Sequence, residues 1–476
     1  MKTLVAVSRI VVGTLFVISG LIKANDSKGF AYKLEEYFDV FTEDITYHQE
    51  AIEQALPEEI ASSSCKEKFK PEITYNKVEI PENERGFIRN TMVKLFQFSK
   101  NNALAMAVII SVIEILLGLF TVVGFQLKIT TWLLMLMIIF FGFLTFYSAY
   151  FNKVTDCGCF GDALKLTPWQ SFLKDMILLV FILPVFIWNK KTNGNEFSTF
   201  EKGVSIASIV FMAVLCIFQF KWNFPILFLG ILLGLRWLLS IKLMPKIQHI
   251  ALALLCVISS SVFAIHCIND LPMKDYRPWK IGNDLRPLRE YIPEVAEVKM
   301  VYIDKQTCEE KLMPTDNWDW FDSTFEASHI FYKQDKKVIK QSVDAKVKDI
   351  SFENTETGEN LADNFFSNEG YSILVVMPKI NEADMRKVEN LRQITQYALE
   401  NNMMILGSTS TGNIEEIDEF KHHYQLPFDI TLNDEKALKT IIRSNPGVVL
   451  VKNGIVINKW SSKRIPTVEI LKENLK

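Results

Sequence analysis

The chain has 476 residues, a formal net charge of −3, and 49% hydrophobic residues, among them 35 phenylalanines. This length predicts two or three domains. The nearly balanced charge, without a dominant basic patch or a nucleic-acid-binding motif, argues against nucleic acid as a partner.

Apolar segments long enough to cross a membrane are confined to the first 267 residues. Seven stretches reach a spanning length of about 17–25 residues: 3–22, 103–123, 129–150, 168–188, 204–220, 224–241 and 248–267. We interpret the first as a retained anchor, because Arg9 interrupts it and no clear small-residue cleavage site follows. The sequence therefore predicts a multi-pass α-helical membrane protein embedded in lipid.

Lysines in the short loops predict the orientation of these spans, because cytoplasmic loops carry an excess of positive charge. With seven spans, these lysines fall on one side: Lys2, Lys128, Lys190, Lys191, Lys202, Lys242 and Lys246. The N-terminus is then cytoplasmic. Residues 24–102, the loop around residue 158 and everything after about residue 268 lie outside, which we take to be the periplasm of a bacterial inner membrane.

Cys157 and Cys159, separated by one glycine, lie in a loop just before the span 168–188. A disulfide between them closes a small, strained ring that is easily reduced, which favours thiol–disulfide exchange. The alternatives are a permanent staple and idle free thiols. Zinc is disfavoured, since a structural site needs four ligands and no further cysteine or histidine lies nearby. Thr167 and Gln170 form a capping box that predicts a helix start directly after this loop.

The first 190 residues also carry a set of shared motifs. These are Arg9 to Gly13, Phe16, Ser19-Gly20 and Lys23 in the first span, Glu114, Gly118 and Gly124 in and after the second, and Cys-Gly-Cys-Phe-Gly before the fourth. In this combination, residues 1–190 resemble the MauE/DoxX family of small membrane proteins. The resemblance implies a four-helix bundle connected with quinone or disulfide redox chemistry. Residues 24–102 are then a periplasmic insertion, and residues 191–267 hold about three additional spans.

Glu114 lies near the middle of its span, where an ionisable side chain is costly unless it is paired. Arg9 enters from the cytoplasmic end at a depth that predicts contact with Glu114. The pair is either a structural lock between two helices or, with Glu114 handling protons, part of a quinone site. Lys174 and Asp175, below the cysteine loop, are either a snorkelling pair or groups that set the thiol pKa.

The remaining cysteines have less specific settings. Cys65, in an acidic loop, is either a shuttle thiol that completes a catalytic set with the Cys-Gly-Cys pair or an unpaired surface cysteine. Cys267 and Cys308 are candidates for a disulfide with each other. Cys216 and Cys256 lie within spans and are interpreted as buried packing residues.

Residues 268–344 are predicted to be a periplasmic connector that begins as a stiff, Pro-rich strap along the membrane surface. From about residue 345, strands and helices alternate. A strand–turn pair is predicted over 347–359, strands at 372–377 and 403–407, helices at 382–401 and 413–424, and a hairpin turning at Asn453-Gly454. This order resembles a thioredoxin/peroxiredoxin-type α/β fold, and Asn445-Pro446 occupies its cis-proline position.

That fold normally carries a CxxC motif after its first central strand, but here Pro378-Lys379-Ile380-Asn381 follows Met377, and no cysteine occurs after Cys308. The domain 345–476 is therefore expected to be redox-inactive and to bind a periplasmic or envelope protein beside Asn445 and Pro446, or to brace the membrane part.

The leading hypothesis is an inner-membrane thiol–disulfide redox protein that uses a quinone and no metal. The alternative is a non-enzymatic envelope assembly or scaffold factor. A transporter is less consistent with the sequence, which lacks repeat symmetry.

Overall fold

The computed structural model describes residues 2–53, 60, 65, 73–154, 158, 160–188, 198–242, 244–316, 318–348, 350–355 and 357–475. The chain divides into two compact units. The first comprises Met1–Val40, Phe96–Arg286 and Asp349–Lys476, and the second comprises Phe41–Leu95 and Pro287–Lys348.

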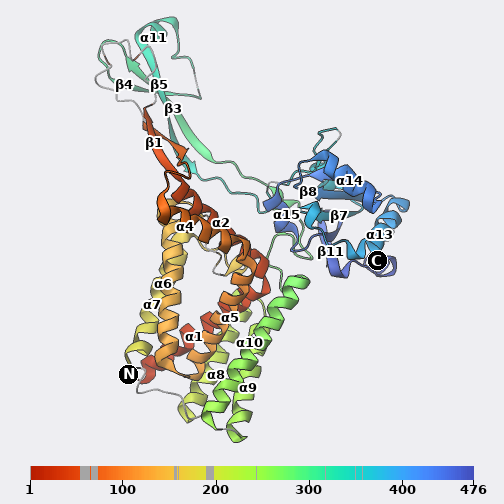
Figure 1. Ribbon diagram of the computed structural model, residues 1–476. Helices are drawn as coiled ribbons and strands as arrows, with labels where there is room; N and C mark the ends of the chain where they lie inside the picture. The colour runs from red at the N-terminus through yellow and green to blue at the C-terminus, as the bar shows by residue number, and fades with distance from the viewer. Residues whose placement is uncertain are drawn as a thin grey trace. The chain divides into compact units, whose positions relative to one another are not determined.

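The first unit contains the membrane helices (Figure 1). In the described ranges, six helical stretches are long and apolar enough to span a bilayer. They are α1 (Lys2–Asn25), α5 (Ala103–Val123), α6 (Leu127–Phe151), α7 (Pro168–Trp188), α8 (Thr199–Val214) with its continuation η3 (Leu215–Phe220), and α10 (Pro245–Asn269). The chain is thus a multi-pass membrane protein.

The predicted span 224–241 is not among these six, because its apolar part is too short. It forms α9 (Phe224–Lys242), whose apolar part is Phe224–Ser240. At 1.5 Å per residue this part is about 25 Å long, against a hydrocarbon core of about 30 Å. Nevertheless, α9 packs against α8 and α10.

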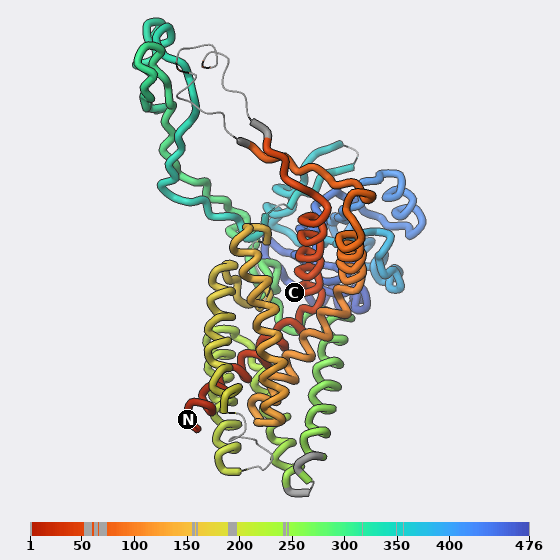
Figure 2. The backbone as a smooth tube through the Cα atoms, turned by 60° about the vertical axis from the view of Figure 1, so that its left-hand side comes forward, coloured from red at the N-terminus to blue at the C-terminus, as the bar shows by residue number. Residues whose placement is uncertain are grey.

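Helix α1 contacts α5, α7 and α8, and it continues into α2 (Ser27–Thr46), as Figures 1 and 2 show. Its closest neighbour is α5, which approaches where both helices carry glycine. A Cβ atom on Gly118 would lie 2.7 Å from the carbonyl oxygen of Gly13, so only glycine permits this approach. Helix α2 buries Phe30, Leu34 and Tyr37, and the Tyr37 hydroxyl lies 2.9 Å from that of Ser148 on α6.

The C-terminal part of the first unit is a thioredoxin-like α/β domain. Its six-stranded sheet has the order β11-β10-β7-β8-β9-β6. The strands are β6 (Glu353–Asn354), β7 (Tyr371–Met377), β8 (Met404–Thr409), β9 (Ile430–Leu432), β10 (Gly447–Lys452) and β11 (Ile455–Ser461). The helices are α12 (Ala362–Ser367), α13 (Val388–Glu400), α14 (Ile414–Tyr424), α15 (Glu435–Ile441) and α16 (Val468–Glu473).

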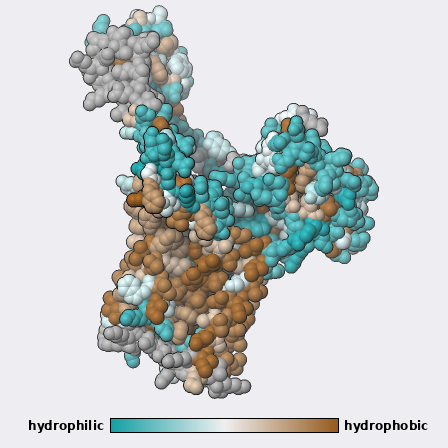
Figure 3. Space-filling model, viewed as in Figure 1, coloured by the Kyte–Doolittle hydropathy of each residue, from teal (hydrophilic) through white to brown (hydrophobic). Residues whose placement is uncertain are grey.

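Strands β7, β8 and β9 are parallel, while β10 runs antiparallel to β7 and forms a hairpin with β11. The Asn445–Pro446 peptide bond is cis, as predicted. The turn of the hairpin expected around 347–359 is present, because Glu353 forms an antiparallel bridge with Asn360 and the Gly358 N–H donates to the carbonyl oxygen of Asn354 at 2.9 Å. The strand before it is shorter than expected, since among the described residues of this range only β6 forms, and it pairs with β9. Hydrophobic residues cover the visible face of the helical part, whereas hydrophilic residues predominate on that of the C-terminal domain (Figure 3).

The second unit contains two antiparallel sheets. One is the hairpin of β1 (Tyr47–Glu53) and β2 (Ile73–Glu79). The other has the order β4-β3-β5 and comprises β3 (Val295–Asp304), β4 (Glu310–Pro314) and β5 (His329–Lys340), with the short helix α11 (Ser323–Ser328) between β4 and β5. The segment 268–344, predicted to be a connector, thus contains a folded sheet over Val295–Lys340 that the sequence did not predict. Helix α4 (Gly86–Asn101) leads from this unit back into the first.

Candidate functional site

The Cys-Gly-Cys loop is described only in part, since Cys157 and Cys159 lie outside the described residues. Gly158 between them has φ +66°, and a Cβ atom there would lie 3.1 Å from Cγ of Lys33 on α2. The backbone conformation therefore favours glycine, whereas the flexible Lys33 side chain could make room for a Cβ atom by a small shift.

The capping box after the loop is confirmed. The Thr167 N–H donates to Oε1 of Gln170 at 3.0 Å, and the Gln170 N–H donates to Oγ1 of Thr167 at 3.3 Å. Because Pro168 has no N–H, three backbone N–H groups at the start of α7 have no partner within the helix, and the cap satisfies two of them, those of Thr167 and Gln170. This reciprocal cap fixes the point at which the chain leaves the cysteine loop.

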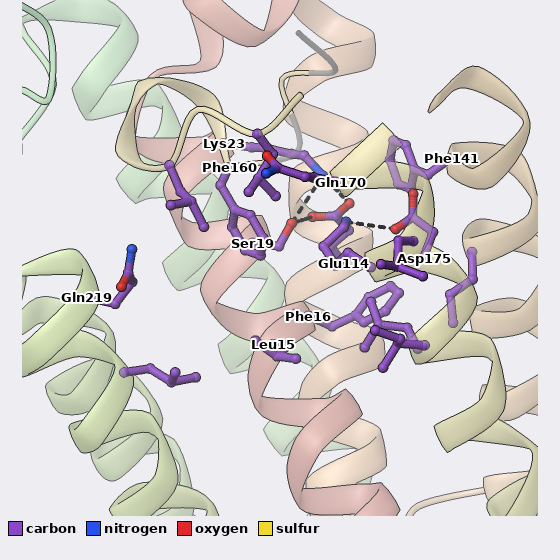
Figure 4. Close-up of a pocket in the computed structure, with 18 of the residues that line it drawn as sticks. Leu15, Phe16, Ser19, Lys23, Glu114, Phe141, Phe160, Gln170, Asp175 and Gln219 are labelled. Carbon is purple, nitrogen blue, oxygen red and sulfur yellow. Dashed lines mark hydrogen bonds and ion pairs between the residues drawn. The ribbon is translucent and has the colours of Figure 1, made fainter. Parts of the chain in front are cut away.

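Below the loop, the membrane helices enclose a cavity of about 370 Å³. Most of its lining is apolar and comes from α1, α6, α7 and η3, including Leu15, Phe16, Ile138, Phe141, Leu173, Ile177, Leu178, Leu215 and Phe220. Its polar lining residues are Ser19, Lys23, Glu114, Gln170, Lys174, Asp175 and Gln219 (Figure 4). Phe160, which directly follows Cys159 in the sequence, also lines the cavity. The cavity therefore borders the cysteine loop.

A buried acid–base cluster occupies one side of this cavity (Figure 4). The Lys23 ammonium is paired with Glu114, and the two side chains are 1% and 2% exposed. The Ser19 hydroxyl donates to Glu114 at 3.0 Å and accepts a hydrogen bond from Lys23 at 3.2 Å. Lys23 also lies 4.3 Å from the ring centroid of Phe141, within cation–π distance. Each charge is thus compensated, as burial requires.

The predicted contact between Arg9 and Glu114 is wrong. Arg9 instead donates to both carboxylate oxygens of Glu201, at 2.8 and 2.6 Å, and to the carbonyl oxygens of Thr121 and Val122 at the end of α5. Among the described residues that line the cavity, Glu114 is present and Arg9 is not.

The prediction was wrong because Glu114 pairs with Lys23, which lies further along the same helix. Lys23 lies fourteen residues after Arg9 on α1, which corresponds to about 21 Å along the helix axis. Glu201 was not predicted as the partner of Arg9 because the expected span began only at residue 204, whereas α8 begins at Thr199.

A second carboxylate faces the cavity from α7. Asp175 is 3.0% exposed at its side chain, pairs with Lys174 at 2.7 Å, and accepts a hydrogen bond from Thr145 at 3.3 Å. Lys174 also lies 5.4 Å from the ring centroid of Phe160. These two residues therefore connect the cavity wall with the residue that follows the Cys-Gly-Cys pair.

Cys65 and Cys308 form a disulfide within the second unit, with a Cα–Cα distance of 5.4 Å. The predicted partnership of Cys308 with Cys267 is therefore wrong, and Cys267 is a buried free thiol. Cys65 is disulfide-bonded and buried, so it is not an unpaired surface cysteine, and its role as a shuttle thiol stays a prediction. Cys216 and Cys256 are buried free cysteines, as the sequence predicted.

The proline loop of the thioredoxin-like domain is well packed. Pro446 is buried, and the Asn445 amide donates to the carbonyl oxygen of Lys379 at 2.7 Å. In the neighbouring loop, the Ser410 hydroxyl donates to the carbonyl oxygen of Pro378 at 2.6 Å. A partner-binding role for Asn445 and Pro446 stays a prediction.

The fold and the site together define a multi-pass membrane protein with a thioredoxin-like C-terminal domain. Residues 83–188 match the family described as methylamine utilisation protein MauE. The chain is also similar to protein TlpB from Flavobacterium psychrophilum, with 28% identity over 89 residues. That similarity covers 19% of this chain and 24% of the relative.

Proposed function

We propose that this chain is an inner-membrane thiol–disulfide redox protein in which Cys157 and Cys159 exchange electrons between periplasmic thiols and a quinone. The MauE match and the similarity to protein TlpB suggest a membrane-associated thiol–disulfide role. The observation that carries the finer proposal is the cavity beside the cysteine loop, which combines apolar walls with a buried acid–base cluster.

The residues present fit a quinone. A volume of about 370 Å³ falls in the range of roughly 300–1,000 Å³ typical of small-molecule sites. Lys23 and Gln170 supply hydrogen-bond donors for quinone oxygens, and the apolar residues of α7 suit a polyprenyl tail.

A bound quinone supplies an acceptor for two electrons and two protons. Oxidation of the Cys157 and Cys159 thiols to one disulfide releases the same numbers, so the exchange needs no further co-reactant. Glu114 and Asp175 are the carboxylates placed to pass protons at the cavity wall. Periplasmic thiols then reduce the disulfide by exchange.

The lysines of the short loops support an orientation with the N-terminus in the cytoplasm and the thioredoxin-like domain in the periplasm. This orientation places the cysteine loop on the oxidising side of the membrane, where disulfides persist.

The test uses the full chain in lipid nanodiscs, reduced and freed of reductant under anaerobic conditions. A short-chain quinone analogue is added, quinol formation is followed by absorbance, and the thiols are alkylated and assigned by mass spectrometry. We expect one quinol per Cys157–Cys159 disulfide. The double variant Cys157→Ser/Cys159→Ser should form none.

The matched control is Cys216→Ser, which removes a buried thiol elsewhere in the helices and should leave quinol formation unchanged. The proposal fails if the reduced wild-type chain, with both loop thiols shown to be free, produces no quinol. It also fails if the loop thiols stay in one state across all conditions.

A second candidate is a non-enzymatic assembly or scaffold factor. It is favoured by one feature, the absence of any cysteine after Cys308 in a domain whose fold normally carries two. Under that function the nanodisc experiment yields no quinol, while a periplasmic or envelope protein co-purifies with the full chain and is lost on truncation after Leu271.

A further inference from the structure

The loop before β10 of the thioredoxin-like domain contacts the corner between α1 and α2. Arg443, three residues before Pro446, donates from Nε to both carboxylate oxygens of Asp26 at 2.9 and 3.1 Å, and from Nη2 to Oδ2 at 2.9 Å. The side chain of Arg443 is only 8% exposed. Lys28 adds a hydrogen bond to the Arg443 carbonyl oxygen at 2.8 Å. The thioredoxin-like domain therefore contacts the α1–α2 corner of its own chain through its proline loop.

The same guanidinium also reaches the cysteine loop. Nη2 of Arg443 lies 3.7 Å from Oδ2 of Asp162, which follows Cys159 by three residues and belongs to the turn η1 (Gly161–Ala163). One side chain thus connects three segments: the proline loop, the α1–α2 corner, and the chain just after the Cys-Gly-Cys pair.

The contact is between charged groups. Burial alone would raise the pKa of Asp26, but Arg443 outweighs this effect and holds that pKa below its usual value. Conversely, burial alone would lower the pKa of Arg443, and the attraction of Asp26 and Asp162 raises it instead. Removing one partner of such a partly buried ion pair lowers the free energy of unfolding far more than removing one partner of a surface pair, because the remaining charge is left without its counter-ion.

A second group of contacts supports this docking. The chain after α10 carries Asp275, which pairs with Arg277 at 2.8 Å and with Lys459 of β11 at 2.9 Å. Nearby, Asp270 accepts a hydrogen bond from Ser461 at 2.8 Å. The strap between α10 and the domain is therefore fixed at several points.

We propose that Arg443 is a positioning residue for the redox site: by pairing with both Asp26 and Asp162, it fixes the turn η1 that follows the Cys157–Cys159 pair. The cysteine-free domain then acts in cis, through its proline loop, on the thiol–disulfide equilibrium of the membrane cysteines. This inference rests on the proposed function of that pair.

The experiment uses the full chain in nanodiscs with Arg443→Gln, Arg443→Lys and the control Arg386→Gln. Arg386 belongs to the same domain and also pairs with an aspartate, Asp384, but its side chain is 73% exposed. One readout is the Cys157–Cys159 oxidation state across glutathione buffers, determined by alkylation. The other is the rate of proteolytic cleavage within residues 271–279.

We expect Arg443→Gln to shift the glutathione ratio at half-oxidation severalfold, because the turn η1, which directly follows the pair, loses its ionic contact with the loop before β10. Cleavage of the strap should also accelerate. Arg443→Lys keeps the charge but not the forked contact with Asp26, so its equilibrium should lie between those of wild type and Arg443→Gln. Arg386→Gln should match wild type in both readouts.

Should Arg443→Gln fail to fold, Asp162→Asn serves instead, because it leaves the Arg443–Asp26 pair in place and weakens only the contacts of Asp162 with Arg443 and with the exposed Lys165. It should change the thiol equilibrium without accelerating cleavage. An unchanged equilibrium in variants that fold, whether or not cleavage accelerates, overturns the positioning role and leaves the proposed function intact. A wild-type pair that never titrates overturns both.

Discussion

Removing one member of the buried Lys23–Glu114 pair should destabilise the membrane part strongly, and removing both should not. The two side chains are 1% and 2% exposed, so each single change leaves a charge without its counter-ion, at a cost of roughly 3–5 kcal/mol. In Glu114→Gln, the Lys23 ammonium keeps the Phe141 ring at 4.3 Å, a contact that contributes about 1 kcal/mol. In Lys23→Met, the carboxylate keeps only the Ser19 hydroxyl. We therefore expect Lys23→Met to be the more destabilising single variant.

The assay is reversible unfolding of the purified chain in lipid, arranged as a double-mutant cycle. The coupling energy should exceed the roughly 0.5–3 kcal/mol usual for contacting residues, because Lys23→Met/Glu114→Gln leaves no unpaired charge and therefore avoids two single costs of roughly 3–5 kcal/mol each. Single variants that unfold within about 0.5 kcal/mol of wild type, or a double variant less stable than both, would refute the reasoning. Quinol formation by the stable double variant then separates the two interpretations of the pair. If it is lost, the pair works at the redox site; if it is retained, the pair is structural.

Four further outcomes are expected. Gly158→Ala should lower the free energy of unfolding by about 1–2 kcal/mol, because alanine is strained at φ +66°; unchanged stability would contradict the loop conformation. Cys65→Ser with Cys308→Ser should cost the second unit roughly 2–5 kcal/mol in unfolding experiments but leave quinol formation intact, and a loss of quinol formation would restore Cys65 as a shuttle. Burial, and after it the nearby Arg277, lowers the pKa of Lys459 from 10.5 to about 7. Between these two pH values the unfolded state binds more protons than the folded state, so the stability of the thioredoxin-like domain should rise with pH there and level off below pH 7. Lys459→Met should abolish this dependence of stability on pH. A reporter fused after Lys476 should be active only if it is a periplasmic one, and activity of a cytoplasmic reporter would reverse the orientation.

Elements governed by local rules were predictable from the sequence. A bilayer requires continuous apolar helices, so hydropathy alone located the six candidate spans found among the described residues. The start of α7 was predicted because Thr167 and Gln170 satisfy each other's amides within one turn. The thioredoxin-like order followed from buried strands of the right length, and the cis peptide before Pro446 followed from that resemblance.

Features that depend on distant partners were not predictable. The sheet of β3, β4 and β5 was missed because few of its residues are buried: β5 has one buried side chain, Ile330, so the alternation that identifies a strand is weak. The disulfide joins cysteines separated by 243 residues. The partner of Arg9 lies 192 residues away. Sequence spacing carries no information about such contacts until the helices are packed.

Helix α1 forms the buried ion pairs Arg9–Glu201 and Lys23–Glu114, and only the second lies at the candidate site. Arg9 binds Glu201 and the carbonyl oxygens that end α5, where a cation also suits the negative end of the helix dipole. Four of its five N–H donors bind these protein acceptors, and Arg9 is not among the described residues that line the cavity. Lys23 lies about four helical turns away, and its partner Glu114 faces the cavity below the cysteine loop. Both pairs resolve the cost of burying charge, but only the second leaves its charged groups beside a space that a ligand can enter. In the proposed reaction, proton transfer therefore takes place near the end of α1 that contacts the loop before β10. At the other end of α1, Arg9 connects α1, α5 and α8.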